Sequence, residues 1–127
     1  MKPVWIAAMI ASCGLGSAAA QDIHAGEILF KKCLPCHAVG EGARNKFGPS
    51  LNGLAGRRIG TAPGYRFSDR YKDSEIVWDE AVFSTYVVDP KSVISNSKMT
   101  FVGIRSQKDA RDLWAYVSSF DENGRRK

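Results

Sequence analysis

The chain has 127 residues, of which 44% are hydrophobic and 24% are charged, and its formal net charge is +5. This length suits one domain rather than two, and the mild basicity is compatible with an acidic protein partner, an anionic membrane surface or nucleic acid. No internal repeat, low-complexity tract or linker interrupts residues 21–127. We therefore expect a single domain over these residues.

Residues 1–20 have the pattern of an export signal. Lys2 supplies a charge, residues 4–11 are apolar, and Ala18-Ala19-Ala20 has the small-residue pattern of a signal-peptidase site. The apolar run is far shorter than the about 18 residues that a membrane-spanning helix needs. We therefore predict a signal peptide that is removed after Ala20, a periplasmic location and no stable membrane insertion.

Cys13 offers an alternative interpretation of this segment. The letters "IASC" loosely resemble a bacterial lipobox, in which Cys13 would be acylated, although the segment before it is short. Cleavage after Ala20 instead removes both Cys13 and Lys2. Of the 127 residues, 107 then remain, with 17 basic and 13 acidic side chains and a formal charge of +4. Export argues against nucleic acid as the partner.

The first part of residues 21–127 combines one helix signal with a long loop. Asp22 can cap a helix over residues 23–32, with Ala25, Ile28 and Leu29 on its apolar face. Residues 38–71 then contain seven glycines and two prolines, which interrupt helix and strand alike. So long a loop is unusual in a small domain unless something inside it holds it in place.

The second part contains the remaining helix signals. Residues 68–74 can form a short helix, residues 79–89 a helix that stops before Pro90, and residues 90–96 another that Pro90 opens. Ser106, with an acidic residue three positions later, resembles a capping box for the last helix. Its apolar face is predicted to contain Ala110, Leu113, Val117 and Phe120. With no β alternation of useful length, the fold class is all-α, with four or five short helices and long loops.

The segment "CLPCH" places Cys33, Cys36 and His37 within five positions. A disulfide across so tight a loop contributes little stability and leaves His37 unexplained. Dithiol exchange needs the cysteines at a helix N-terminus, whereas here they follow a helix. A zinc site with His24 as the fourth ligand would need adjacent Cys36 and His37 to chelate one ion. The remaining interpretation is covalent attachment of haem, for which C-x-x-C-H is the signature.

A haem iron held by His37 needs a sixth ligand. Met1 and Met9 leave with the signal peptide, so Met99 is the only methionine in residues 21–127. His24 is the only other histidine, and it lies upstream on the same side as the attachment turn. We therefore predict that His37 and Met99 are the metal ligands, and that the haem supplies a core without which the chain is largely unfolded.

Residues 33–65, "CLPCHAVGEGARNKFGPSLNGLAGRRIGTAPGY", and residues 89–104, "DPKSVISNSKMTFVGI", resemble class I cytochromes c in order and spacing. The resemblance is to the soluble bacterial members that are similar to mitochondrial cytochrome c, and it covers essentially all of residues 21–127. It implies a cytochrome c fold wrapped around one haem c, attached through thioethers to Cys33 and Cys36. It also implies an electron carrier of the respiratory chain and not an enzyme, because both axial positions are filled.

Five further residues match positions around the haem in this family. The resemblance implies that the Pro49 carbonyl accepts a hydrogen bond from the proximal imidazole and that the Tyr86 hydroxyl lies near the methionine sulfur. It also implies that Arg57 and Trp78 hold a buried propionate and that Phe101 lies beside the haem edge.

Two departures from the family pattern affect the surroundings of the haem. Phe67 stands where many relatives offer a tyrosine hydroxyl to a propionate, so one hydrogen bond is expected to be missing. Ser95, Asn96 and Ser97 replace the Pro-Gly-Thr that is common before the methionine. We therefore expect a more mobile distal loop, and an enzyme or gas sensor with a weak Met99 bond is the alternative function. A disulfide- or zinc-stapled binding module without haem is a third.

Basic residues flank the attachment turn, the glycine-rich loop and the methionine loop. In this family these segments border the exposed haem edge, so we expect a basic ring that steers redox partners with acidic docking surfaces. A bc1-type complex, a terminal oxidase or a photosynthetic reaction centre fits this description, with the carrier itself a monomer. The residues of this basic ring are Lys31, Lys32, Arg44, Lys46, Lys91, Lys98 and Arg105.

Overall fold

The computed structural model describes residues 1–5, 21–101 and 103–127. Cleavage after Ala20 and acylation of Cys13, the two predictions for the N-terminal segment, concern positions outside these described residues. Within the described ranges, no helix combines the length and the hydropathy that crossing a lipid bilayer requires.

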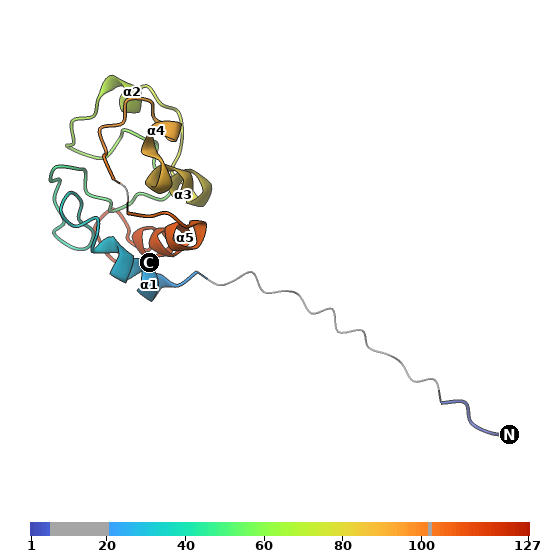
Figure 1. The fold of residues 1–127 in the computed structure, drawn as a ribbon. Helices are drawn as coiled ribbons and strands as arrows, with labels where there is room; N and C mark the ends of the chain where they lie inside the picture. The colour runs from blue at the N-terminus through green and yellow to red at the C-terminus, as the bar shows by residue number, and fades with distance from the viewer. Residues whose placement is uncertain (6–20, 102) are drawn as a thin grey trace.

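The described chain forms helices and loops, and it contains no named strand. The helices are α1 (Ile23–Phe30), α2 (Asp69–Lys72), α3 (Glu80–Val88), α4 (Pro90–Val93) and α5 (Gln107–Val117). The prediction of an all-α fold with short helices and long loops is therefore confirmed. In Figure 1, α1 and α5 lie at the bottom of the domain, α3 lies above them and contacts both α5 and α4, and α2 lies at the top.

Local capping signals explain where three of the helices begin. The side chain of the residue just before the helix accepts a hydrogen bond from the third backbone amide in each case, which satisfies a donor that has no partner inside the helix. Asp22 accepts from Ala25 at 3.0 Å, and Ser106 accepts from Asp109 at 3.0 Å. Asp79 caps α3 in the same way, with 2.8 Å between its Oδ1 and the amide nitrogen of the third helical residue.

The buried face of α1 matches the predicted one only in part. Ala25 and Leu29 are half-buried, and Leu29 packs against the core, as predicted. Ile28 is 52% exposed, whereas Gly26 and Phe30 are buried. A Cβ atom at Gly26 would lie 2.7 Å from the carbonyl carbon of Asp112 and 2.9 Å from Cβ of Tyr116. The backbone of α1 therefore lies close against α5 at a residue without a side chain, and this contact helps to place Gly26 on the inner face.

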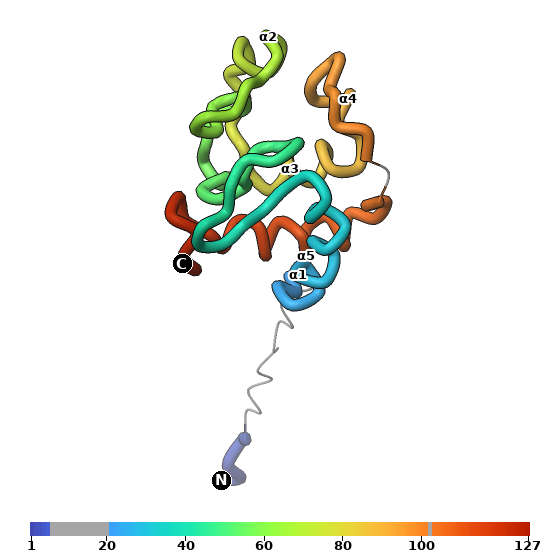
Figure 2. Tube along the Cα trace, turned by 90° about the vertical axis from the view of Figure 1, so that its left-hand side faces the viewer, coloured from blue at the N-terminus to red at the C-terminus, as the bar shows by residue number. Residues whose placement is uncertain are grey.

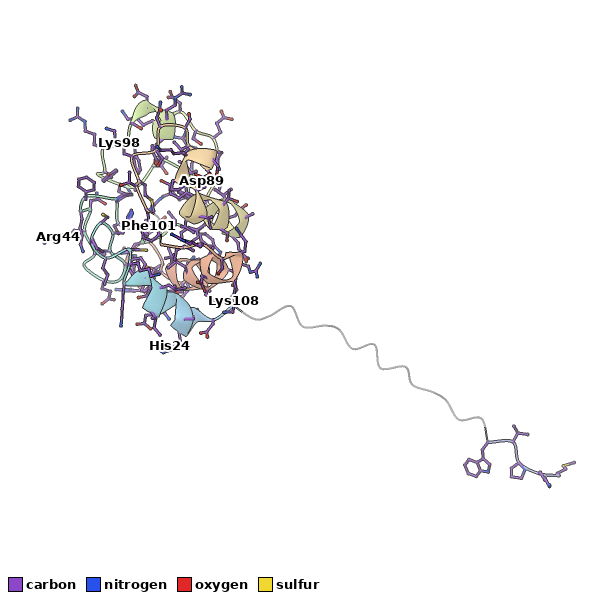
Figure 3. The ribbon with its side chains drawn as sticks, in the orientation of Figure 1. His24, Arg44, Asp89, Lys98, Phe101 and Lys108 are labelled. Atoms are coloured by element: carbon purple, nitrogen blue, oxygen red, sulfur yellow. The ribbon has the colours of Figure 1, made fainter. Side chains whose placement is uncertain are left out.

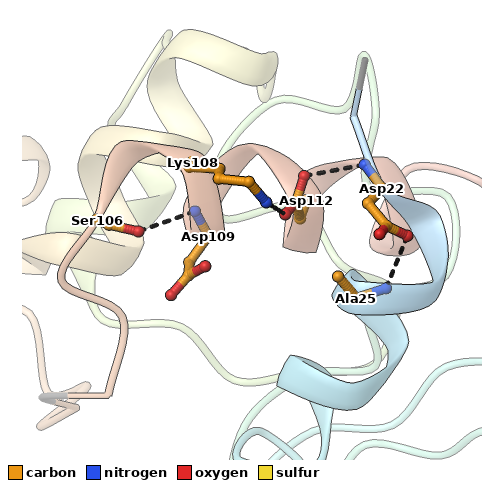
Figure 4. A network of polar contacts seen from close by, with 6 residues as sticks. All are labelled: Asp22, Ala25, Ser106, Lys108, Asp109 and Asp112. Carbon is orange, nitrogen blue, oxygen red and sulfur yellow. Dashed lines mark hydrogen bonds and ion pairs between the residues drawn. The ribbon is translucent and has the colours of Figure 1, made fainter. Parts of the chain in front are cut away.

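A buried carboxylate fastens α1 to α5 (Figure 4). Asp112 is 2% exposed, and its Oδ1 accepts a hydrogen bond from the backbone amide of Asp22 at 2.9 Å. Its Oδ2 pairs with Lys108 Nζ at 2.7 Å. The amide and the ammonium both favour the charged form and hold the pKa of Asp112 below its usual range. The start of the domain is thereby tied to its last helix.

The core fills the space between α3 and α5 and extends into the long loop. Phe83 and Val87 on α3 and Leu113 and Val117 on α5 are buried, as is Ile59 of the loop. No helix occurs between Phe30 and Asp69, as the breaker residues predict. Figure 2 shows the chain rising from the base as two arms, one with residues around 55–75 and α2, the other with residues around 90–100 and α4.

Candidate functional site

A cavity of about 440 Å³ lies inside the domain. Its walls come from the turn after α1, from the long loop, from α3 and α5, and from the segment after α4. All eight predicted site residues line it: Cys33, Cys36, His37, Pro49, Arg57, Trp78, Tyr86 and Met99. Residues 66 positions apart in sequence thus face one space, which apolar side chains such as Leu54, Phe83 and Val87 close on the inner side.

The turn that follows α1 brings the two thiols to the cavity. The Cys33 amide donates to the Phe30 carbonyl at 2.8 Å, and the Cys33 carbonyl accepts from the amides of Cys36 and His37 at 3.0 and 2.8 Å. Both cysteines are free, so the disulfide interpretation does not describe this structure. Burial raises the pKa of Cys33 to about 11, with a smaller contribution from Cys36. A thiol that is so weakly acidic is a poor choice for dithiol exchange.

The described residues do not support the zinc interpretation. Over the described ranges of the chain, no three His, Cys, Asp or Glu side chains converge in a way that could hold a metal ion. His24 lies on the exposed side of α1, where its Nδ1 is 3.8 Å from a carboxylate oxygen of Glu27. It therefore does not join His37 and the cysteines.

The imidazole of His37 is held in one orientation. Its Nδ1 lies 2.7 Å from the Pro49 carbonyl oxygen, and a carbonyl can only accept, so Nδ1 carries the proton and Nε2 keeps its lone pair. Burial lowers the pKa of His37, which favours the neutral ring. A Cβ atom at Gly48 would lie 2.8 Å from both ring nitrogens. The ring is thus enclosed on one side, and its free nitrogen is available as a ligand.

Arg57 and Trp78 lie on the same wall of the cavity. The Trp78 amide donates to the Arg57 carbonyl at 2.9 Å, and the Arg57 Nη1 donates to the Asn52 carbonyl at 2.9 Å. Burial lowers the pKa of Arg57, yet a guanidinium remains charged at any physiological pH. A half-buried cation with several N–H groups left over suits a carboxylate ligand in the cavity.

Met99 reaches the cavity from the segment after α4. Its backbone amide donates to the Ser97 Oγ at 3.3 Å, and Ser97 is only 5% exposed. Tyr86 projects from α3 into the same region, where burial raises the pKa of its phenol far above the usual value. The Tyr86 hydroxyl is 2.8 Å from the hydroxyl of Tyr71. Sequence reasoning missed Tyr71, whose only signal is one aromatic residue in the charged stretch "SDRYKDS".

Phe67 lines the cavity without offering a hydroxyl. Its ring lies between those of Tyr65 and Tyr71, with ring centroids 4.8 and 5.7 Å away. The Tyr65 hydroxyl donates to the Phe47 carbonyl at 2.7 Å. Phe67 thus belongs to a cluster of three aromatic rings in edge-on and tilted contact, at a position where many relatives are expected to have a tyrosine. Phe101 also lines the cavity and is half-buried.

These walls fit a covalently bound porphyrin. Two free thiols one turn apart match two thioether bonds, and an imidazole with a free Nε2 and a methionine sulfur match two axial ligands. The apolar lining matches the macrocycle, and Arg57 matches a propionate. Each element of the donor set is thus present in one cavity.

Every member of the basic ring is exposed. Lys32 and Lys98 also line the cavity, and the Lys32 Nζ donates to the Gly103 carbonyl at 3.1 Å. Figure 3 labels Arg44 and Lys98 on the side of the domain away from Asp89. Two of the seven members, Lys32 and Lys98, therefore place positive charge beside the cavity.

Comparisons with known proteins agree with this geometry. The family model described as cytochrome c matches residues 23–121. Cytochrome c2 of Rhodoplanes tepidamans is 54% identical over 107 residues, which are 84% of this chain and 100% of that protein. Cytochrome c2 of Blastochloris viridis is 43% identical over 127 residues and the full length of both chains. The structure of cytochrome c2 from Rhodospirillum centenum superimposes with a TM-score of 0.73 at 31% identity, covering 79% of this chain and 98% of that one.

Proposed function

We propose a function that starts from the family: the chain belongs to the cytochrome c family and carries one covalently attached haem c. In this proposal it is a soluble periplasmic electron carrier, and His37 and Met99 are the iron ligands. The observation that carries this proposal is the single cavity in which the thiols of Cys33 and Cys36, the free Nε2 of His37 and the side chain of Met99 meet.

The bound haem supplies one-electron exchange between ferric and ferrous iron. The protein residues determine the conditions for that exchange. The Pro49 carbonyl fixes the tautomer and the orientation of His37, and such a bond makes the imidazole a more basic ligand. A thioether ligand such as Met99 favours the reduced state and raises the reduction potential. The buried apolar walls exclude water, which limits solvent reorganisation during transfer.

The same residues favour a carrier over an enzyme or gas sensor. Two protein ligands leave no coordination position for a substrate. The alternative function requires a loosely held Met99, as the replacement of Pro-Gly-Thr by Ser95, Asn96 and Ser97 suggests. The burial of Ser97 and its hydrogen bonds instead support a well-anchored methionine.

Residues 1–20 are proposed to be a signal peptide that is removed after Ala20. Removal leaves 107 residues, which equals the 107 residues over which the complete cytochrome c2 of Rhodoplanes tepidamans aligns. Maturation at this site also removes Cys13, so the periplasmic carrier has no lipid anchor.

The partners are proposed to be redox proteins with acidic docking surfaces, such as a bc1-type complex, a terminal oxidase or a reaction centre. The seven exposed residues of the basic ring support electrostatic steering, which speeds association and weakens as salt screens the charges. The carrier works as a monomer. An association rate that does not change with ionic strength would contradict the steering.

The intact mass of the natively matured protein, combined with a pyridine haemochrome spectrum, tests the proposal. We expect the mass of residues 21–127 plus one haem, with the spectrum of two thioether bonds. The oxidised protein should also show the long-wavelength sulfur-to-iron charge-transfer band, and Met99→Ala should lose this band while keeping the haem. A haem-free product, an acylated Cys13 or a band that persists in Met99→Ala would each overturn the corresponding part.

A further inference from the structure

We propose that Tyr71 is the positioning residue for Met99. In this proposal, its hydroxyl ties α2 to the distal loop (residues 94–101) and thereby keeps the methionine sulfur directed at the iron. This inference rests on the proposed function, because it takes Met99 to be an iron ligand. The proposal follows from the contacts of the Tyr71 side chain.

The first observation is the isolation of α2. In the described part of the chain, α2 contacts none of the other helices. Figure 2 shows α2 and α4 on separate arms. An open hollow of about 380 Å³ separates these arms, lined by α2 residues such as Asp69 and Arg70 on one side and by Val93, Ile94 and Ser95 on the other. Side chains that cross between the arms therefore carry the connection.

The second observation is the set of hydrogen bonds that crosses this gap. The Tyr71 hydroxyl is 2.8 Å from the Tyr86 hydroxyl and also bonds to the Ser97 Oγ. The direct distance between the Tyr86 hydroxyl and the Ser97 Oγ is 3.4 Å, at the limit of a hydrogen bond. Tyr71 is thus the central member of the three hydroxyl groups.

The donors and acceptors in this cluster can be assigned so that they connect Tyr71 with the backbone amide of Met99. Each hydroxyl has one proton to donate and two lone pairs. If Tyr86 donates to Tyr71 and Tyr71 donates to Ser97, then Ser97 uses both lone pairs, one for Tyr71 and one for the Met99 amide. The Ser97 proton then remains for the weak contact with the Tyr86 hydroxyl at 3.4 Å, so each contact in the cluster has one donor and one acceptor. This arrangement places one side chain, Ser97, between Tyr71 and the backbone of the ligand residue.

The third observation is that Tyr71 is itself held firmly while the distal loop needs support. A Cβ atom at Gly60 would lie 2.9 Å from the Lys72 amide nitrogen, so the loop backbone presses against α2, and the Tyr71 ring packs near Phe67. Asn96, next to Ser97, has φ of 62°. Asparagine tolerates this conformation but does not enforce it. The loop conformation is therefore stabilised from outside, at Ser97.

The test uses the haem-loaded ferric protein and the variant Tyr71→Phe, which removes the hydroxyl and keeps the ring. Imidazole is the probe, because it replaces the methionine sulfur on the iron and abolishes the charge-transfer band. A lost hydrogen bond is expected to raise the apparent imidazole affinity by roughly three- to tenfold. The midpoint potential should fall, since a less well-held thioether stabilises ferrous iron less.

Tyr65→Phe is the matched control. It also removes a tyrosine hydroxyl from the cavity lining, but that hydroxyl bonds to the Phe47 carbonyl and not to the distal loop. We expect wild-type imidazole affinity and potential for this variant. We also expect Ser97→Ala to mimic Tyr71→Phe, and the double variant to add little beyond either single change.

Three outcomes would overturn the proposal. Tyr71→Phe could match wild type in imidazole affinity and potential, or Tyr65→Phe could change both as much, or Tyr71→Phe and Ser97→Ala could act additively. The second result would mean that Tyr71 acts only through general stability. If the wild-type protein itself lacks the charge-transfer band, Met99 ligation fails and the proposal falls with it, which is a distinguishable result.

Discussion

Replacement of Gly48 by alanine tests how the proximal histidine is held. Gly48 is not among the residues with positive φ, so its backbone does not require glycine. The available space does require glycine, because an added Cβ would lie 2.8 Å from Nδ1 and Nε2 of His37 and closer still to Cε1. Ordinary contacts begin at 3.4 Å. The imidazole must therefore move by about 0.6 Å or more, toward the cavity.

This displacement has a calculable cost. A shift of about 0.6–1 Å would lengthen the 2.7 Å bond between His37 Nδ1 and the Pro49 carbonyl to the limit of hydrogen bonding. Loss of that bond costs about 1 kcal/mol, and overpacking adds about 1–3 kcal/mol. We expect Gly48→Ala to lower the free energy of unfolding by about 2–4 kcal/mol. The midpoint potential should rise, because a less basic imidazole stabilises ferric iron less.

Denaturant unfolding of the haem-loaded protein and a redox titration measure both effects. Gly42→Ala is the control, since its Cβ meets no atom within 4 Å and only the positive φ of 76° is penalised, at about 1 kcal/mol. If Gly48→Ala matches Gly42→Ala in stability and keeps the wild-type potential, the clamp on His37 is refuted.

Three other changes test the packing of the fold. Gly26→Ala should lower the free energy of unfolding by about 2 kcal/mol in denaturant titrations. The overpacking cost of about 3 kcal/mol exceeds the gain of about 1 kcal/mol from alanine in a helix. Unchanged stability would contradict the close contact of α1 with α5. Because the pKa of Asp112 is lower in the folded than in the unfolded chain, its charged form stabilises the fold above the ordinary pKa of 3.8. This stabilisation disappears as the pH falls through the folded-state pKa, so the free energy of unfolding should decrease below about pH 4. Asp112→Asn should weaken this dependence of stability on pH. A double variant of Cys33→Ala and Cys36→Ala, expressed without haem, should lack native helicity in far-ultraviolet circular dichroism, because the apolar walls of the cavity of about 440 Å³ would then have nothing to pack against. Native helicity in this variant would contradict the prediction.

Local signals predicted much of this fold. The helix starts follow from side chains that bond amides three positions away, so Asp22 and Ser106 could be identified from neighbouring letters. The haem-attachment motif is equally local, since one turn of backbone brings Cys33, Cys36 and His37 together. The proposed ligand Met99 could be named because few alternatives exist in residues 21–127, and the structure brings it to the same cavity.

Contacts between distant segments could not be predicted in this way. Ile28 is exposed while Gly26, a residue without a hydrophobic signal, lies close against α5. The crowding of His37 by Gly48 depends on backbone positions that no periodicity encodes. Tyr71 lies in a charged stretch that indicates a solvated helix, and its role becomes visible only when the partner hydroxyls from two other segments are in place.

The junction of α1 with α5 implies that different parts of the domain have different free energies of opening. The buried carboxylate of Asp112 bonds to the Asp22 amide, so the chain between residues 22 and 112 forms a loop whose two ends are held together. The arms that bear α2 and α4 can then swing open as a sub-global unit while the fastened ends stay closed. Native-state hydrogen exchange should therefore show amides near Ile94 and Tyr71 exchanging through a low-energy opening, and amides of Leu113 and Val117 exchanging only through complete unfolding.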